Sequence, residues 1–215
     1  MKLGAKELRV SEPIKADLAK IKRRDICIIC DNVLDTYNIG SIFRLADAVA
    51  ARCIYLCGQS ETPPNSRISK ASVGTDKWVP WRYASTAAEA ITRIKDEGLR
   101  INVHSRSARS LDRAHSGSEL QNSYAHPRGA QRSDQAHPGG EIRIIAIEQG
   151  KGSVDFRKAQ YQEPVVFIVG HETEGVSKEA LKLADQIVEI PMFGVNRSLN
   201  VMVSLAIILY QVVGD

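Results

Sequence analysis

Apolar runs bounded by turn residues alternate along this chain with stretches of helical periodicity. The runs at 25–30 and 164–170 consist almost entirely of Val, Ile, Phe and Cys, a pattern typical of strands buried on both faces of a sheet. Between such runs, apolar residues recur at the spacing of an amphipathic helix, as at 39–50. The alternation predicts an α/β fold, with a parallel sheet covered by helices on both faces.

Caps and turn residues set the expected bounds of these elements. The stretch at 85–98 begins with a Ser and ends with a Gly, the residue types that favour helix N-caps and C-caps. We expect strands at 25–30, 53–58, 141–149, 164–170 and 186–191, and helices at 39–50, 85–98, 177–184 and from Ser198 nearly to the terminus.

The last of these helices is apolar nearly all round between Val201 and Val213, whereas most terminal helices keep one wet face. It is too short and too interrupted to span a bilayer, so we expect a core helix and no membrane association. A monomer of this size has difficulty hiding such a surface. We therefore expect a second copy to cover it in a homodimer.

The composition is that of a globular protein with a mild basic excess. At 215 residues and 43% hydrophobic content, the chain can bury the core of one domain. The net charge of +4 permits binding to nucleic acid without requiring it. The first ten residues lack the apolar stretch of a signal peptide, so we expect a cytoplasmic protein.

Four cysteines lie within or beside the apolar runs: Cys27, Cys30, Cys53 and Cys57. Cys27 and Cys30 form a C-x-x-C, but a spacing of three in a strand directs the two side chains to opposite faces. No second Cys or His pair lies nearby. We therefore expect four reduced, buried cysteines and no metal site.

One segment interrupts the alternation of strands and helices. Between His104 and Glu141 the chain is rich in Ser, Gly, Arg and His, and a repeat at 22 residues matches at 8 of 16 positions. Such a segment has almost no apolar residues to offset the entropy of ordering. We expect an inserted tandem repeat at about 102–141, forming a mobile, disordered surface loop within a domain at 25–215.

A basic segment at 1–24 precedes the expected domain. Its cations are the residues most able to contact nucleic-acid phosphates, although an ordinary solvated helix would carry the same charges. The candidates are Lys15, Lys20, Lys22, Arg23 and Arg24.

Two groups of polar residues stand near predicted strand ends, where α/β folds bind their ligands. Asn38 lies after the first strand, and Arg44 follows six residues later on the next helix. We expect both to face one site, although a capping Asn beside a surface Arg would give the same pattern. Glu172 and Glu174 follow the strand that ends at Gly170. Two acidic residues there favour a cationic or hydroxyl-bearing ligand over a pyrophosphate. The alternative is that this segment is a glycine-rich turn that binds no ligand.

A third group stands between the last strand and the last helix. The sequence IPM at 190–192 is followed by Ser198, Leu199 and Asn200. Ser198 and Asn200 fall in the first turn of the expected helix, where polar side chains cap free N–H groups or meet a ligand. No G-x-G-x-x-G follows the first strand, and no Walker, H-E-x-x-H or G-x-S-x-G motif occurs. These absences argue against dinucleotide, NTPase, zinc-protease and hydrolase functions.

In this order and at these spacings, the three groups resemble the three motifs of the SpoU/TrmH branch of the SPOUT methyltransferases. The matching patterns are N-x-x-x-x-x-R, then G-x-E-x-x-G, then IPM followed by SLN, and the likeness extends over residues 25–213. The resemblance implies transfer of a methyl group from S-adenosylmethionine to a ribose 2′-hydroxyl of tRNA or rRNA. It also implies a homodimer with the terminal helix in its interface, and a trefoil knot near the C-terminus, an exception to the rule that chains avoid threading.

The same resemblance assigns individual residues. It places Gly170, Ile190, Met192 and Leu199 around S-adenosylmethionine, largely through backbone groups. The catalytic positions of the family match Asn38, Arg44, Glu172, Ser198 and Asn200.

A guanidinium is effectively always protonated, so we expect Arg44 to clamp a nucleotide phosphate. Asn38 and Glu172 would fix its geometry, while Ser198 and Asn200 would position the ribose or the cofactor. Two alternatives stay open: a knotted RNA-binding module without turnover, and an enzyme of the same fold that methylates a base nitrogen. The expected partners are RNA and a second copy, with neither a metal nor a membrane.

Overall fold

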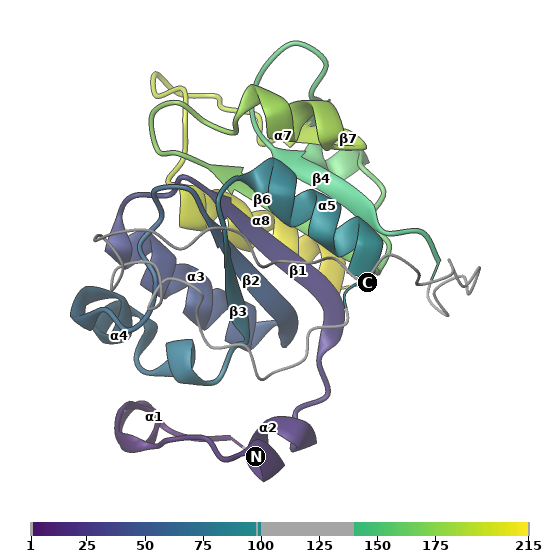
Figure 1. The fold of residues 1–215 in the computed structure, drawn as a ribbon. Coiled ribbons are helices and arrows are strands. Elements are labelled where there is room, and N and C mark those ends of the chain that lie inside the picture. The colour runs from purple at the N-terminus through teal and green to yellow at the C-terminus, as the bar shows by residue number, and fades with distance from the viewer. Residues whose placement is uncertain (1, 98, 100–139, 215) are drawn as a thin grey trace, which may run out of the picture.

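The computed structural model describes residues 2–97, 99 and 140–214. Among them, seven parallel strands form one sheet in the order β3-β2-β1-β6-β4-β7-β5 (Figure 1). The strands are β1 (Arg24–Asp31), β2 (Ala51–Cys57), β3 (Trp81–Ala84), β4 (Arg143–Ile147), β5 (Val154–Asp155), β6 (Val165–Gly170) and β7 (Gln186–Glu189). The predicted α/β fold with a parallel sheet is confirmed.

Helices cover both faces of this sheet. One face packs against α3 (Thr36–Ala48) and α8 (Val201–Val213), and the other against α5 (Ala87–Glu97) and α7 (Lys178–Leu183). In Figure 1, α5 lies in front of the central strands and α8 behind them. The other described helices are α1 (Ala5–Val10), α2 (Lys15–Lys20) and α4 (Ser66–Ser72), with the short 3-10 helices η1 (Thr75–Lys77) and η2 (Phe156–Lys158).

The terminal helix begins later than the sequence predicted. The sequence predicts a start at Ser198, but α8 begins at Val201 because Asn200 is its N-cap. The Oδ1 atom of Asn200 accepts hydrogen bonds from the N–H groups of Met202 (3.0 Å) and Val203 (3.4 Å). A cap residue has extended backbone, so Ser198 lies in the loop ahead of the helix rather than in its first turn.

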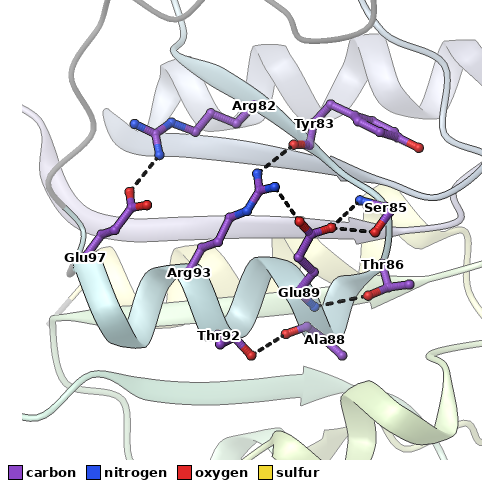
Figure 2. A network of polar contacts seen from close by, with 9 residues as sticks. All are labelled: Arg82, Tyr83, Ser85, Thr86, Ala88, Glu89, Thr92, Arg93 and Glu97. Carbon is purple, nitrogen blue, oxygen red and sulfur yellow. Dashed lines mark hydrogen bonds and ion pairs between the residues drawn. The ribbon is translucent and has the colours of Figure 1, made fainter. Parts of the chain in front are cut away.

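Polar contacts fasten α5 to the neighbouring strand β3 (Figure 2). Arg93 Nη1 donates to the carbonyl of Tyr83 at 3.3 Å, and the same guanidinium pairs with Glu89 one turn earlier. The Glu89 carboxylate also accepts the N–H of Ser85 at 2.7 Å. The Thr86 hydroxyl accepts the N–H of Glu89 at 3.1 Å, so Thr86 rather than the expected Ser85 caps this helix.

Two arginines of the N-terminal segment bind the fold itself. Arg23 donates to the carbonyls of Ala51 (3.0 Å) and Trp78 (2.6 Å). Arg24 Nε donates to the carboxylate of Glu163 at 2.5 Å. These contacts use guanidinium donors that the sequence analysis offered as candidate phosphate contacts. Arg23 fastens the N-terminal segment to the domain, and Arg24 is itself the first residue of β1.

The cysteines depart from expectation in one pair. Cys27 and Cys53 are register partners on the adjacent strands β1 and β2, with Cα atoms 5.0 Å apart, and they form a disulfide. The expectation that all four cysteines are reduced is therefore wrong for this pair. The sequence analysis considered two cysteines within one strand, whereas the disulfide joins neighbouring positions on two adjacent strands. Cys30 and Cys57 are free and buried, and burial raises the pKa of both thiols.

Residues 100–139 hold nearly all of the predicted insertion at 102–141 and lie outside the described residues, so the insertion stays a prediction. In the part of the chain that the structure describes, no helix is long and apolar enough to cross a membrane. The same residues include no group of three or more His, Cys, Asp or Glu side chains placed to hold a metal ion.

Candidate functional site

The order of the strands in the sheet reverses between β1 and β6, which is a topological switch point. These strands are parallel neighbours, with Asp31 opposite Gly170 at their carboxyl ends. The chain leaves β1 for α3 on one face and leaves β6 for α7 on the other. Adjacent strands that lead to opposite faces open a crevice at the carboxyl edge, where α/β folds bind their ligands.

Three of the predicted catalytic residues are in direct contact at this edge. Asn38 Nδ2 donates to Oε1 of Glu172 at 3.0 Å, and Asn38 Oδ1 accepts from Nδ2 of Asn200 at 2.9 Å. The three side chains come from α3, from the loop after β6 and from the cap of α8. Each amide has one donor end and one acceptor end, so these contacts fix the orientation of both. We call the array of Glu172, Asn38 and Asn200 the Asn38 bridge.

Backbone groups also hold the carboxylate of Glu172. Its Oε2 accepts the N–H of Leu34 at 3.2 Å, and its Oε1 accepts that of Asp35 at 3.1 Å. Burial alone would raise the pKa of Glu172, but hydrogen bonds from Asn38 and from backbone N–H groups outweigh it and hold that pKa below its ordinary value. Glu172 is therefore an ionised acceptor that positions the loop after β1, and it is a poor proton acceptor.

A cavity of about 410 Å³ opens beside the Asn38 bridge. This volume lies within the usual range for small-molecule sites. The wall comes from the segments that follow β4, β6 and β7 and from the first turn of α8. Every residue predicted to hold the cofactor lines the cavity, as do three of the predicted catalytic residues: Gly170, Ile190, Met192 and Leu199, with Glu172, Ser198 and Asn200.

The cavity wall is acidic. It carries the carboxylates of Glu148, Glu172 and Glu189, and among the described residues neither Lys nor Arg lines it. Glu174, which the sequence analysis grouped with Glu172, is exposed and does not belong to the wall. Carboxylates around a partly enclosed site favour a ligand with positive charge.

Arg44 lies outside this cavity. Its side chain is exposed on α3, and none of the described residues forms a hydrogen bond or ion pair with it. Six residues along an α-helix leave two side chains about 120° apart around the axis. Asn38 therefore faces the bridge while Arg44 faces solvent, and the expectation that both face one site is not met within a single chain.

Among the cavity residues that the sequence analysis missed, Glu148 and His171 are polar side chains that hold the loop after β6. Glu148 directly follows β4, and its Oε2 accepts the N–H of Val176 at 2.8 Å. His171 Nδ1 accepts the N–H groups of Thr173 (3.0 Å) and Glu174 (3.2 Å), so the proton of the neutral ring lies on Nε2. Each residue directly follows a strand, and that position is the signal that could have identified them.

Comparison with known proteins agrees with this geometry. The sequence matches the profile of the SpoU rRNA Methylase family over residues 25–130 and 112–210, more than half of the chain. The chain belongs to this family. The matched residues include all three motifs and the whole of the Asn38 bridge.

Relatives of this SpoU-family chain include two bacterial proteins named as tRNA (guanosine(18)-2′-O)-methyltransferases. The protein of Escherichia coli strain K12 is 26% identical over 193 residues, which cover 88% of this chain and 63% of that protein. The protein of Thermus thermophilus is 27% identical over 207 residues, covering 96% of this chain and 81% of that protein. The chain thus spans less than two thirds of the length of the E. coli protein.

Solved structures of SpoU proteins share the fold. The Aquifex aeolicus TrmH/SpoU tRNA modifying enzyme has a TM-score of 0.64 and 25% identity, over 98% of this chain and 81% of that chain. AviRb from Streptomyces viridochromogenes, solved with S-adenosylmethionine, has a TM-score of 0.63 and 22% identity, over 92% and 64%. The SpoU/TrmH fold predicted from the sequence is confirmed, and the trefoil knot stays a prediction.

Proposed function

We propose that this protein is an S-adenosylmethionine-dependent methyltransferase that acts on a ribose 2′-hydroxyl of tRNA or rRNA. Its family and the names of the E. coli and T. thermophilus relatives support this activity. The observation that carries the proposal is the Asn38 bridge beside the cavity, because it joins side chains from all three motifs at one edge of the sheet.

The cavity fits S-adenosylmethionine in size and in charge. When bound, this cofactor supplies a methyl group on a positively charged sulfur. The carboxylates of Glu148, Glu172 and Glu189 suit that charge, and the described wall carries no Lys or Arg to oppose it. Four residues on the wall would hold the cofactor: Gly170, Ile190, Met192 and Leu199.

The side chains beside the cavity would orient the accepting ribose. In-line transfer requires the hydroxyl oxygen to lie about 3 Å from the methyl carbon, and rigid donors achieve this at least entropic cost. Asn200 is rigid, since its Oδ1 is occupied by α8 and its Nδ2 by Asn38. Its second Nδ2 hydrogen and the Ser198 hydroxyl have no partner among the described residues and would be available to the ribose or the cofactor. Glu172 holds Asn38 and so acts through orientation rather than proton transfer.

Arg44 is suited to binding the RNA substrate. Its guanidinium is exposed at the surface of α3, and its planar fork matches two oxygens of a phosphate. A phosphate held there would anchor the nucleotide whose ribose enters the cavity, and the fixed positive charge would favour the hydroxyl's loss of a proton. This role needs no contact between Arg44 and the cofactor.

A homodimer would cover the outer face of α8. Val203 (37% exposed), Ile207 (37%) and Tyr210 (56%) share that face at the spacing i, i+4, i+7. An exposed apolar stripe on a helix is typical of an interface. Sedimentation velocity should show a dimer at micromolar concentration, and Ile207→Asp should shift it to a monomer. A wild-type monomer that still methylates RNA would refute the dimer.

The function is tested by mapping 2′-O-methylation in tRNA and rRNA from cells with and without this gene. The proposal predicts the loss of one or a few sites, which wild-type protein restores and an Asn200→Ala variant does not. Loss of a base methylation with unchanged ribose methylation would contradict the choice of acceptor. An unchanged pattern of both kinds would contradict the proposed activity.

A further inference from the structure

The turn after β6 is held from within by His171. Its Nδ1 atom accepts the N–H groups of Thr173 and Glu174 at 3.0 and 3.2 Å. Its carbonyl accepts the N–H of Gly175 at 2.9 Å, and its own N–H donates back to the carbonyl of Gly175 at 3.0 Å. Three consecutive backbone donors therefore have acceptors within the turn itself.

The next two donors are held from outside the turn by carboxylates. The N–H of Val176 donates to Glu148 Oε2 at 2.8 Å, and the N–H of Ser177 donates to Asp31 Oδ2 at 2.9 Å. Each backbone N–H from residue 173 to residue 177 thus has a specific acceptor. Val176 is buried, and a buried backbone donor is costly to leave unpaired. Together with the other four hydrogen bonds, this contact fixes the path of the loop.

These carboxylates come from the two strands that flank β6. Asp31 is the last residue of β1, Glu148 directly follows β4, and β6 lies between those strands in the sheet. The second oxygen of each is also occupied: Glu148 Oε1 accepts the N–H of Gln149 at 2.9 Å, and Asp31 Oδ1 accepts from Asn32 Nδ2 at 2.9 Å. The loop is therefore clamped from both sides by carboxylates that are themselves oriented.

The contact between Glu148 and the loop is close. Gly175 has φ of +73°, and a Cβ atom at that position would overlap the Glu148 carboxylate. A glycine suits both the backbone conformation, which other residues rarely adopt, and the space that Glu148 leaves in this arrangement. The identity of residue 175 and the position of Glu148 therefore depend on each other.

We propose that Glu148 and Asp31 are positioning residues for methyl transfer, an inference that rests on the proposed function. They clamp the loop at 170–177, and this loop carries Glu172 into the Asn38 bridge. The same loop supplies five residues of the cavity wall: Gly170, His171, Glu172, Thr173 and Gly175. A shift of the loop would move the wall and the bridge together, and misplacement by about 1 Å costs on the order of 100-fold in rate.

Glu89 offers a matched control for Glu148. It too is a carboxylate that accepts a backbone N–H, from Ser85 at 2.7 Å, and it lies in the network that joins α5 to β3 (Figure 2). It is absent from the described cavity wall. Glu148→Gln and Glu89→Gln therefore make the same chemical change at two carboxylates that each accept a backbone N–H, one beside the cavity and one remote from it. Glu89 also pairs with Arg93, so its loss tests stability away from the cavity.

The test compares these two variants in the full-length protein. Glu148→Gln keeps the shape of the side chain but replaces one acceptor oxygen with a donor. We expect kcat to fall about 10-fold and the Kd for S-adenosylmethionine to rise several-fold, with KM for RNA within twofold of wild type. Hydrogen exchange at Val176 should become faster without any ligand. Glu89→Gln should lower the melting temperature comparably while leaving kcat and Kd unchanged.

A double variant checks the contact itself. Gly175→Ala should impair activity through its clash with Glu148, and adding Glu148→Ala should relieve part of that loss, so the two effects should not add. Strict additivity would contradict the contact. Asp31 is buried, so if Asp31→Asn fails to fold, the Glu148 variants decide the matter.

Two outcomes separate the failures. If the wild-type protein methylates RNA and Glu148→Gln matches it in kcat, Kd and Val176 exchange, the positioning role is overturned while the proposed function stands. If the wild-type protein neither binds S-adenosylmethionine nor methylates RNA, the proposed function has failed. The exchange measurement on the unliganded protein still reports on the clamp in that case.

Discussion

Two loops form much of the cavity wall, and they are held in different ways. After β6, each backbone N–H of residues 173–177 has an acceptor. Between β7 and α8, the described contacts ahead of the cap include one backbone N–H, from Ser198 to Asn196 Oδ1 at 3.3 Å. The side chains of Phe193 and Val195 in this second loop are 90% and 102% exposed.

The difference indicates that the loop after β6 has its final conformation before any ligand binds, whereas the loop between β7 and α8 becomes ordered when ligands bind. A loop whose donors are already paired presents its wall without further ordering, whereas a loop with few contacts takes an entropic cost from binding. Asn200 is where the two meet, because it ends the second loop and is tied through Asn38 to Glu172 in the first. Four predictions follow from this contrast, from the largest expected effect to the smallest.

Breaking the link between the loops should have the largest effect. Asn200→Ala removes the contact with Asn38 and the cap of α8, and we expect kcat to fall about 100- to 1,000-fold, as for a lost preorganised donor. Asn200→Ser keeps a capping oxygen but is too short to reach Asn38. Melting temperatures and single-turnover rates separate the two roles: Ser should restore stability but not turnover. Full turnover in the Ser variant would show that the link is dispensable.

Arg44 tests whether the chemistry extends beyond both loops. We expect Arg44→Ala to lower turnover about 10- to 100-fold, the size of a lost charge-assisted hydrogen bond. Affinity for S-adenosylmethionine should stay within a few-fold, because Arg44 is outside the cavity wall. Calorimetry and initial rates measure both quantities. An Arg44→Lys variant at the wild-type rate would contradict the phosphate clamp, since ammonium lacks the planar fork.

The response to cofactor should differ between the loops. Hydrogen exchange with and without S-adenosylmethionine should show protection of residues 193–200 rising about tenfold, while residues 173–177 are protected from the start and change little. The segment at 87–97 in α5 serves as an internal reference. Equal protection of both loops before the cofactor is added would remove the contrast.

Acidification should weaken the contacts through which Glu172 joins the loop after β6 to the loop after β1 and to Asn38. The pKa of Glu172 in the folded protein lies below the ordinary value of 4.5, so its stabilising effect is fully present above pH about 4.5 and is lost as pH falls through the folded pKa. The melting temperature of wild type should therefore decline in that acid range more steeply than that of Glu172→Gln. Parallel curves for the two proteins would contradict the assigned hydrogen bonds.

The sequence predicted the sheet and the cavity better than the contacts that hold them. The unbroken apolar runs identified β1 and β6, the two strands between which the crevice opens, because burial on both faces leaves a strong pattern. The sequence analysis did not identify β3 or β5. β3 has four residues and lies partly exposed at one edge of the sheet, and β5 has two residues. Short edge strands bury too little to show a period.

Contacts between distant segments were hidden for a different reason. The pairing of Cys27 with Cys53 depends on the register of two strands, and the clamp of Glu148 on Val176 depends on the order of three. No spacing along the chain encodes either relation. The motifs correctly indicated that Asn38, Glu172 and Asn200 lie together. They did not indicate that Arg44 lies on a different side of α3, facing solvent.

The central claim is that the Asn38 bridge serves methyl transfer to ribose, and one assay tests it most directly. Purified wild-type and Asn38→Ala proteins are incubated with methyl-labelled S-adenosylmethionine and the RNA identified by site mapping, and the products are digested to nucleosides for mass spectrometry. We expect the label in a 2′-O-methylated nucleoside, with a rate at least about 100-fold lower for Asn38→Ala and cofactor binding retained. Label on a base, or an Asn38→Ala protein that works at the wild-type rate, would contradict the account.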